Sequence, residues 1–410
     1  MGGFLIRLPF LGTDWHVTSD LAQLGAWALR LRQTSVVDFY DGRAQLYPPL
    51  TTFILKATAQ VELTLPPAWR ENSRALNGLL KFPATVADTL TAFALAMAVW
   101  ARPRVAVLCA ALYIFHPAIF YVCVFWGQLD SVYTALLVCG LVALQKKKWV
   151  GAWLAAAAAL GSKVQAVAFL PVLMADTLRR GGIRAAVGGV IVFVGVLLLL
   201  AVPWWWTGRL DSQFFDSIFL SSRTPRAVVS GYNLWYLILD ERAHTTSSLA
   251  QIPLLGLSIR TLGMLGYGAY TSFIAFGLWQ KRARDSVLGA TLTSFGLFML
   301  PAEVHERFLF PVIALLMLAW ASSAVQSDRA RTRVYAIVLG VLSLTFSFNL
   351  ITIAQPYFIA SLNLVARPID SVWVWILKFL AQSAALVNLL LFGGLTVLFW
   401  KGTNRHDARV

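Results

Sequence analysis

Residues 185–203 read AAVGGVIVFVGVLLLLAVP and carry no charged side chain. A helix of about 20 such residues is long enough to cross the hydrocarbon core of a bilayer. We therefore expect an all-α polytopic membrane protein with about 11–12 transmembrane helices. The other apolar runs of this chain lie at 84–101, 105–124, 131–145, 149–161, 164–178, 253–279, 286–302, 308–325, 334–354 and 372–400.

Basic residues outnumber acidic ones by 34 to 19, and many of them lie between the apolar runs. Loops rich in Lys and Arg are held at the cytoplasmic face, so this excess indicates topology rather than nucleic-acid binding. All the clusters fit one alternating path if 149–178 forms two short helices that turn near Gly161 and Ser162. The clusters are Arg102/Arg104, Lys146/Lys147/Lys148, Arg179/Arg180/Arg184, Lys281/Arg282/Arg284, Arg329/Arg331/Arg333 and Lys401/Arg405.

This path assigns the remaining polar segments to the extracytoplasmic face. They are residues 13–83, 126–130, Lys163, 204–252 and 304–307. Helix ends at a membrane surface tolerate polar groups that the bilayer centre would penalise, so their gathering there indicates a reaction site. We divide the chain into a catalytic transmembrane module (1–203) whose long first loop is 13–83, an extracytoplasmic loop (204–252) and a C-terminal transmembrane module (253–410).

The first loop is expected to contain interfacial helices. Over residues 20–33, DLAQLGAWALRLRQ, the apolar side chains of Leu21, Leu24, Ala28 and Leu31 share one helical face. Such a helix suits the plane of a membrane interface. A second helix of this kind is expected over 50–63.

Three aspartates at this face have competing interpretations. Asp20 could cap the helix that it precedes or act as a general base, and Asp130 could cap the following helix or belong to a site with Gln128. Trp126 beside it could belong to the aromatic belt. Asp41 is a weaker candidate, because FYDGRAQLYPPL (39–50) also reads as a structural turn fixed by its two prolines.

The cations at the same face indicate a functional role more strongly than the three aspartates do. Lys163 stands alone between apolar runs, where a lysine would normally be paired, and it favours a functional role. His305, Glu306 and Arg307 could form an internal salt-bridge cap, but a guanidinium and an imidazole would also bind an anion. Asp88, inside an apolar run, has a hydrogen-bonded packing role as its ordinary explanation.

Five motifs occur in one order along the chain. They are SDLAQLGAW (19–27), YPPLTTF (47–53), WGQLDS (126–131), SKVQAVAFLP (162–171) and VHERFLFP (304–311). Their order resembles the GT-C superfamily of polytopic glycosyltransferases, which use polyprenyl-phosphate sugars. It is most similar to the dolichyl-phosphate-glucose glucosyltransferases of asparagine-linked glycan assembly and to the GPI mannosyltransferase II branch with its bacterial relatives.

The resemblance implies an inverting hexosyltransferase that moves glucose or mannose to an acceptor hydroxyl outside a bacterial plasma membrane. It places the catalytic base at Asp20 and the donor-phosphate contacts at Lys163, His305 and Arg307. The substrate would be a lipid-linked sugar, and the acceptor a glycan or glycolipid. Substrate-site candidates are Asp41, Tyr47, Trp126, Gln128, Asp130, Gln165, Asn233 and Glu306.

We expect no metal or other cofactor. A second acidic residue sometimes accompanies the catalytic aspartate of this family, but Ser19 and Leu21 flank Asp20 here. Cys109, Cys123 and Cys139 lie in apolar runs without metal-ligand or redox spacing. The competing function is a transporter or flippase of a lipid-linked anion, which would use the same cations but would need no base in the first loop.

Overall fold

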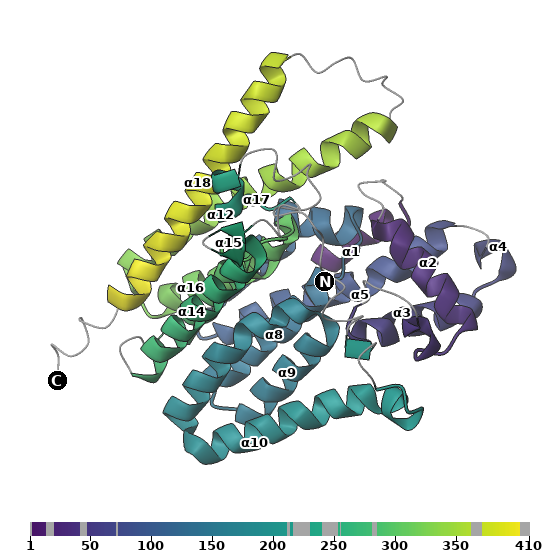
Figure 1. Cartoon of the computed structure of the whole chain (residues 1–410), viewed down its shortest axis with the longest axis horizontal. Helices are drawn as coiled ribbons and strands as arrows, with labels where there is room; N and C mark the ends of the chain where they lie inside the picture. Colours follow the sequence, from purple (N-terminus) through teal and green to yellow (C-terminus); the bar gives the residue numbers. More distant parts are fainter. Residues whose placement is uncertain are drawn as a thin grey trace. The chain divides into compact units, whose positions relative to one another are not determined.

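In the residues that it describes, the computed structural model is all-α apart from one short hairpin (Figure 1). It describes residues 2–13, 20–41, 47–70, 73–210, 214–215, 230–239, 253–254, 256–280, 285–361 and 371–401. The chain forms two compact units, residues 1–167 with 187–222 and residues 168–186 with 223–410. Most of the predicted 204–252 loop, the cluster at Lys281, and Arg405 lie outside the described residues.

The first unit begins with short helices and continues with longer apolar ones. Its elements are α1 (Gly2–Leu11), α2 (Asp20–Gln33), η1 (Asp38–Tyr40), α3 (Pro49–Leu63), α4 (Pro67–Arg70), α5 (Ser73–Ala98), α6 (Pro103–Ile114), α7 (Pro117–Phe120), η2 (Tyr121–Phe125), α8 (Asp130–Gln145) and α9 (Trp149–Ser162). The expected first-loop helices at 20–33 and 50–63 are thus confirmed as α2 and α3. Helix α5 begins inside the predicted 13–83 loop, so the polar segment before the first long apolar helix is shorter than expected.

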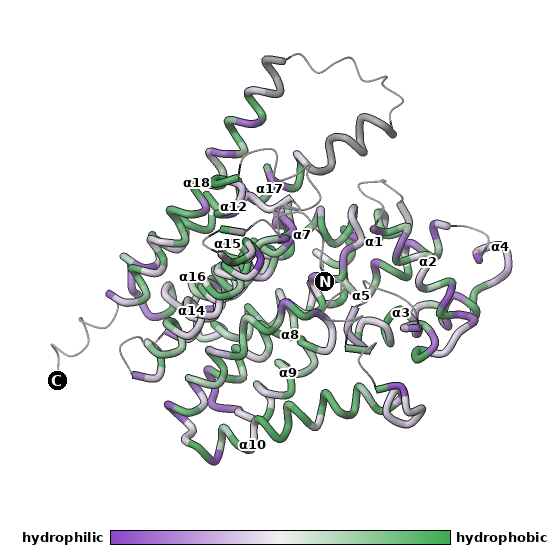
Figure 2. Tube along the Cα trace, viewed as in Figure 1, coloured by the Kyte–Doolittle hydropathy of each residue, from purple (hydrophilic) through white to green (hydrophobic). Residues whose placement is uncertain are grey.

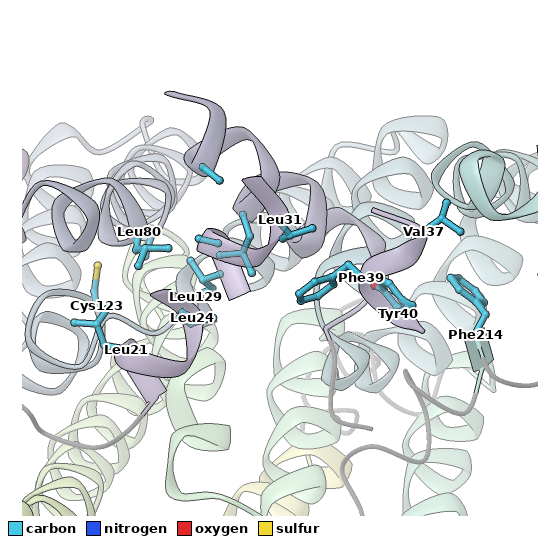
Figure 3. Close-up of a cluster of buried hydrophobic side chains, with 14 of the residues drawn as sticks. Leu21, Leu24, Leu31, Val37, Phe39, Tyr40, Leu80, Cys123, Leu129 and Phe214 are labelled. Atoms are coloured by element: carbon cyan, nitrogen blue, oxygen red, sulfur yellow. The ribbon is translucent and has the colours of Figure 1, made fainter. Parts of the chain in front are cut away.

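The apolar face of α2 is buried within the protein. Leu21, Leu24, Ala28 and Leu31 are buried, as the period of 3.6 residues predicts, in a cluster that includes Leu80 of α5 (Figure 3). The expectation that this face would lie on the membrane interface is therefore replaced by packing against α3 and α5. Packing of this kind fixes the position of Asp20 at the start of α2.

The predicted break in 149–178 is confirmed. Helix α9 ends at Ser162, and Lys163 has an extended backbone (φ −155°, ψ 130°). After η3 (Val164–Phe169), helix α10 (Leu170–Trp206) contains Gly182 with a non-helical backbone, φ 75° and ψ −177°. The predicted runs 164–178 and 185–203 therefore belong to two helices that meet at Gly182.

The second unit contains the rest of the described helices. They are α12 (Leu234–Leu239), α14 (Ile259–Trp279), α15 (Ser286–Met299), η5 (Glu306–Leu309), α16 (Phe310–Val325), α17 (Arg329–Ser361) and α18 (Ser371–Lys401). The predicted run 253–279 does not begin as a helix, because β1 (Pro253–Leu254) pairs with β2 (Leu257–Ser258) before it. The Ser258 hydroxyl then accepts a hydrogen bond from the Thr261 N–H and caps α14.

Several helices suit a membrane. Within the described residues, five are long and apolar enough to cross one, or six if the bent pair 103–114 and 117–125 is one span. Figure 2 shows α10 as hydrophobic along most of its length, and its Leu199 and Trp206 side chains are exposed, as contact with lipid requires. Helices α8, α9 and α15 are shorter than about 20 residues, so the count of about 11–12 crossings stays a prediction.

Helix directions place the polar motifs of the first unit together. A Cβ at Gly127 would lie 3.4 Å from Lys81 Cγ, so the first half of α5 lies beside the turn that precedes α8. The ion pair between Asp130 and Lys163 joins the start of α8 to the end of α9. It follows that the starts of α5 and α8 and the end of α9 share one end of this unit. The basic turns at 102–104 and 146–148 follow the opposite ends of these helices.

Candidate functional site

Asp20 lies at the centre of a group of predicted site residues. Its Oδ2 atom accepts a hydrogen bond of 3.0 Å from the Trp126 indole N–H and one of 2.6 Å from the Gln128 amide N–H. The side chain of Asp20 is half-buried at the first residue of α2. Two donors on one carboxylate oxygen fix the orientation of the group, which is what a base acting on a bound hydroxyl requires.

The backbone before α8 is shaped to present these two donors. Residues 121–125 form a π-helical turn, after which the Gln128 N–H bonds to the Val122 carbonyl. Gly127 has φ +75°, in the left-handed region that favours glycine. A Cβ at Gly127 would lie 2.9 Å from Leu21 Cδ1 and 3.4 Å from Lys81 Cε. The glycine therefore permits close approach of the Leu21 and Lys81 side chains.

Asp130 and Lys163 form a second polar pair at the same end of the unit. The Lys163 ammonium lies 2.5 Å from Asp130 Oδ1, and their side chains are 8% and 0% exposed. The same ammonium lies 5.3 Å from the centre of the Tyr133 ring. Helix α8 begins at Asp130 itself, and Leu129 occupies the cap position. The carboxylate of Asp130 thus pairs with Lys163 and does not cap helix α8.

The end of α9 is tied to the first-loop helices. The Thr51 hydroxyl of α3 donates a hydrogen bond of 2.7 Å to the Ser162 carbonyl, directly before Lys163. Gln165 follows on η3 and is half-buried. The Thr51 contact holds the backbone before Lys163 against helix α3, which begins within the YPPLTTF motif.

Asp41 and Tyr47 have structural partners. Arg209 donates to Asp41 at 2.7 Å and to Asp38 at 2.6 Å in an exposed cluster. Hydrogen bonds from Ser35 and Arg209 lower the pKa of Asp38 below its usual value. The Tyr47 ring packs edge-on against Trp27, and its carbonyl accepts a bond from the Tyr40 hydroxyl. Both site candidates remain predictions, with these contacts as their observed roles.

In the second unit, the VHER segment (residues 304–307) is a turn with closely spaced charged side chains. Glu303 has φ 64° and accepts a hydrogen bond of 3.0 Å from Arg260 Nε. Glu306, 1% exposed, lies between His305 at 3.9 Å and Arg307 at 3.8 Å. The predicted internal salt bridges are therefore present. Their long separations leave an anion-binding role for His305 and Arg307 compatible with the geometry.

The segment 230–233 packs on this turn. The Val304 carbonyl accepts hydrogen bonds from the N–H groups of Ser230 and Gly231. Burial raises the pKa of the Tyr232 phenol, and the negative charge of Glu306 raises it further. The neutral phenol hydroxyl therefore remains part of a stable polar network with Thr352.

Asn233 holds this segment in place. Its side chain is fully buried, donates to the carbonyls of Phe298 and Pro301, and accepts from the N–H groups of Trp235 and Tyr236. These contacts use both ends of the amide and begin helix α12. A substrate contact by Asn233 stays a prediction.

Two buried cations were missed in the sequence. Lys81 and Arg7 are both 0% exposed. Lys81 lies at the end of the predicted first loop, where a lysine looks solvent-exposed. Arg7 pairs with Asp88 at 3.4 Å, and Asp88 also accepts a bond of 2.9 Å from the Tyr113 hydroxyl. The hydrogen-bonded packing role expected for Asp88 is thus confirmed.

The first unit brings together Asp20, Trp126 and Gln128, and beside them Asp130 and Lys163. His305, Glu306, Arg307 and Asn233 belong to the second unit. Within the described residues there is no group of three His, Cys, Asp or Glu side chains that could hold a metal ion. No known protein-family model matches the chain, and no curated protein matches it.

Proposed function

We propose that this chain is an inverting glycosyltransferase of GT-C type that uses a polyprenyl-phosphate sugar. The observation that carries the proposal is the carboxylate of Asp20, oriented by Trp126 and Gln128. The resemblance in sequence named Asp20 as the base and the WGQLDS motif as part of the same site. The hydrogen bonds from Trp126 and Gln128 of this motif to Asp20 support that assignment.

In the proposed reaction Asp20 removes the proton of an acceptor hydroxyl. The acceptor oxygen forms a bond to the anomeric carbon as the bond from that carbon to the phosphate oxygen breaks, with inversion. The leaving polyprenyl phosphate keeps the electron pair. Proton removal by a positioned carboxylate contributes roughly 10²–10⁴-fold to such a step.

The leaving phosphate gains negative charge, which cations stabilise more in the transition state than in the ground state. The proposal assigns this role to Lys163 of the first unit, and for His305 and Arg307 of the second unit it stays a prediction from the resemblance. The ion pair with Asp130 would fix the Lys163 ammonium, whose three N–H donors allow it to contact more than one acceptor.

The proposed site lies outside the cytoplasm. Asp20, Asp130 and Lys163 belong to the end of the first unit opposite the basic turns at 102–104 and 146–148. Basic turns favour the cytoplasmic side, so this arrangement supports an extracytoplasmic reaction, which we place at a bacterial plasma membrane.

The test is donor turnover by the purified protein in detergent. Polyprenyl-phosphate glucose, mannose and an amino sugar, each radiolabelled in the sugar, are incubated with a lipid and glycan extract that supplies acceptors. We expect one donor to yield labelled product and an equal amount of polyprenyl phosphate, and Asp20→Asn to abolish both. If none of the three donors turned over and the protein moved the intact donor across a vesicle membrane, a flippase function would replace this proposal.

A further inference from the structure

Lys81 contacts both Thr13 and the turn at Gly127. Its ammonium donates a hydrogen bond of 2.6 Å to the Thr13 carbonyl, and residues 14–19 connect Thr13 to Asp20 in the sequence. Its hydrocarbon stem lies against Gly127, in the turn whose neighbours Trp126 and Gln128 donate to Asp20. One side chain therefore joins Thr13 to the turn that orients the Asp20 carboxylate.

Burying an ammonium has a cost that a methionine of similar volume would avoid. A charged group removed from water is destabilising unless hydrogen bonds compensate it. Lys81 is 0% exposed, and one of its hydrogen bonds goes to the backbone carbonyl of Thr13, two residues after α1. An ammonium at this position can hold backbone in place, which an apolar side chain of similar volume could not do.

We infer that Lys81 is a positioning residue for Asp20, anchored at the Thr13 carbonyl and acting through the Gly127 turn. The inference rests on the proposed transferase function, because it assigns Lys81 to the geometry of the same base. A base displaced by about 1 Å can cost up to 10²-fold in rate, so small shifts of these segments are sufficient.

Lys56 is a matched control. Its ammonium also donates to backbone carbonyls, those of Leu31 and Thr34, with the bond to Thr34 at 2.9 Å. These carbonyls lie at the far end of helix α2, of which Asp20 is the first residue. Lys56 therefore makes the same kind of backbone contact as Lys81, but far from Asp20.

The kinetic test compares Lys81→Met, Lys81→Arg and Lys56→Met in the full-length protein. We expect Lys81→Met to lower kcat by about 10-fold or more while the donor KM changes by less than about 2-fold. Lys81→Arg should recover much of kcat, because a guanidinium can still donate to the Thr13 carbonyl. A wild-type kcat in Lys81→Met, or an equal loss in Lys56→Met, would overturn the inference.

A second readout does not depend on turnover. Amide hydrogen exchange reports local opening, so it is measured on peptides covering 20–33 and 121–131. We expect Lys81→Met to speed exchange near residue 20 and in 121–131, and Lys56→Met to speed it only near residue 33. Unchanged exchange in Lys81→Met would overturn the inference. If the wild type transferred no sugar but the two variants showed the expected changes in exchange, the proposed function would fail and the positioning role of Lys81 would stand.

Discussion

Gln128 Nε2 lies 2.6 Å from Asp20 Oδ2, although 108 residues separate the two positions in the sequence. The same oxygen accepts the indole N–H of Trp126. These two hydrogen bonds fix the direction of the carboxylate lone pairs. A carboxylate that only caps helix α2 would not need hydrogen bonds from two side chains so distant in the sequence.

The first prediction concerns these two donors. Trp126→Phe and Gln128→Leu each remove one hydrogen bond to Asp20, so each should lower kcat by about 10–10²-fold at little change in donor KM. Trp153→Phe, a buried tryptophan near the start of α9, is the control and should retain wild-type turnover. The measurement is steady-state kinetics with the preferred sugar donor. Full activity in both Trp126→Phe and Gln128→Leu would argue against a catalytic role for Asp20.

The second prediction concerns the pair Asp130 and Lys163. Because both side chains are buried, Asp130→Leu or Lys163→Met alone should lower the free energy of unfolding by about 3–5 kcal/mol. The double variant should regain much of that stability, as a denaturant titration in detergent would measure. Sugar transfer should stay lost in the double variant, because no ammonium remains for the phosphate. Recovery of transfer together with stability would show that Lys163 is purely structural.

The third prediction separates stability from function at Arg7. Arg7 and Asp88 are both fully buried, so Arg7→Met leaves a buried carboxylate and should cost about 3–5 kcal/mol in unfolding free energy. Arg7→Met/Asp88→Leu should be closer to the wild type. Transfer per folded molecule should not change in either variant. An unaltered unfolding midpoint in Arg7→Met would argue against this pairing.

The fourth prediction concerns the VHER segment. Arg307→Ala should raise the donor KM by about 10–10²-fold, and Arg307→Lys by less, since lysine retains the charge but loses the two-pronged donor geometry. Arg260→Ala removes a nearby charge that pairs with Glu303 and serves as the control. Equal donor KM values in Arg307→Ala and the wild type would remove Arg307 from the phosphate site.

Periodic sequence features predicted local structure well. The spacing of Leu21, Leu24, Ala28 and Leu31 predicted α2 and its buried face, because a helix repeats every 3.6 residues. What covers that face could not be predicted, since apolar side chains suit lipid and protein equally. The helix break before Lys163 was predictable, because 149–178 is too long for one crossing.

Contacts between distant segments were less accessible. The sequence favoured a functional role for Lys163 and indicated that it would be paired. Its partner Asp130 was not predictable, because that residue could equally have been a helix cap. Lys81 gave no signal, because a lysine before an apolar run usually points to water. Asp20 stood out through the order of the motifs, and its contact with Gln128 could be known only from the fold.

Asp20→Asn is the decisive test of whether Asp20 removes the acceptor proton. Asparagine keeps the size of the side chain and caps a helix about as well as aspartate, but it cannot accept the proton. The account predicts that transfer falls by roughly 10²–10⁴-fold while donor affinity, measured by equilibrium binding, is retained. Asp130→Asn, measured alongside, should weaken donor affinity through Lys163 instead. Full transfer by Asp20→Asn would contradict the account.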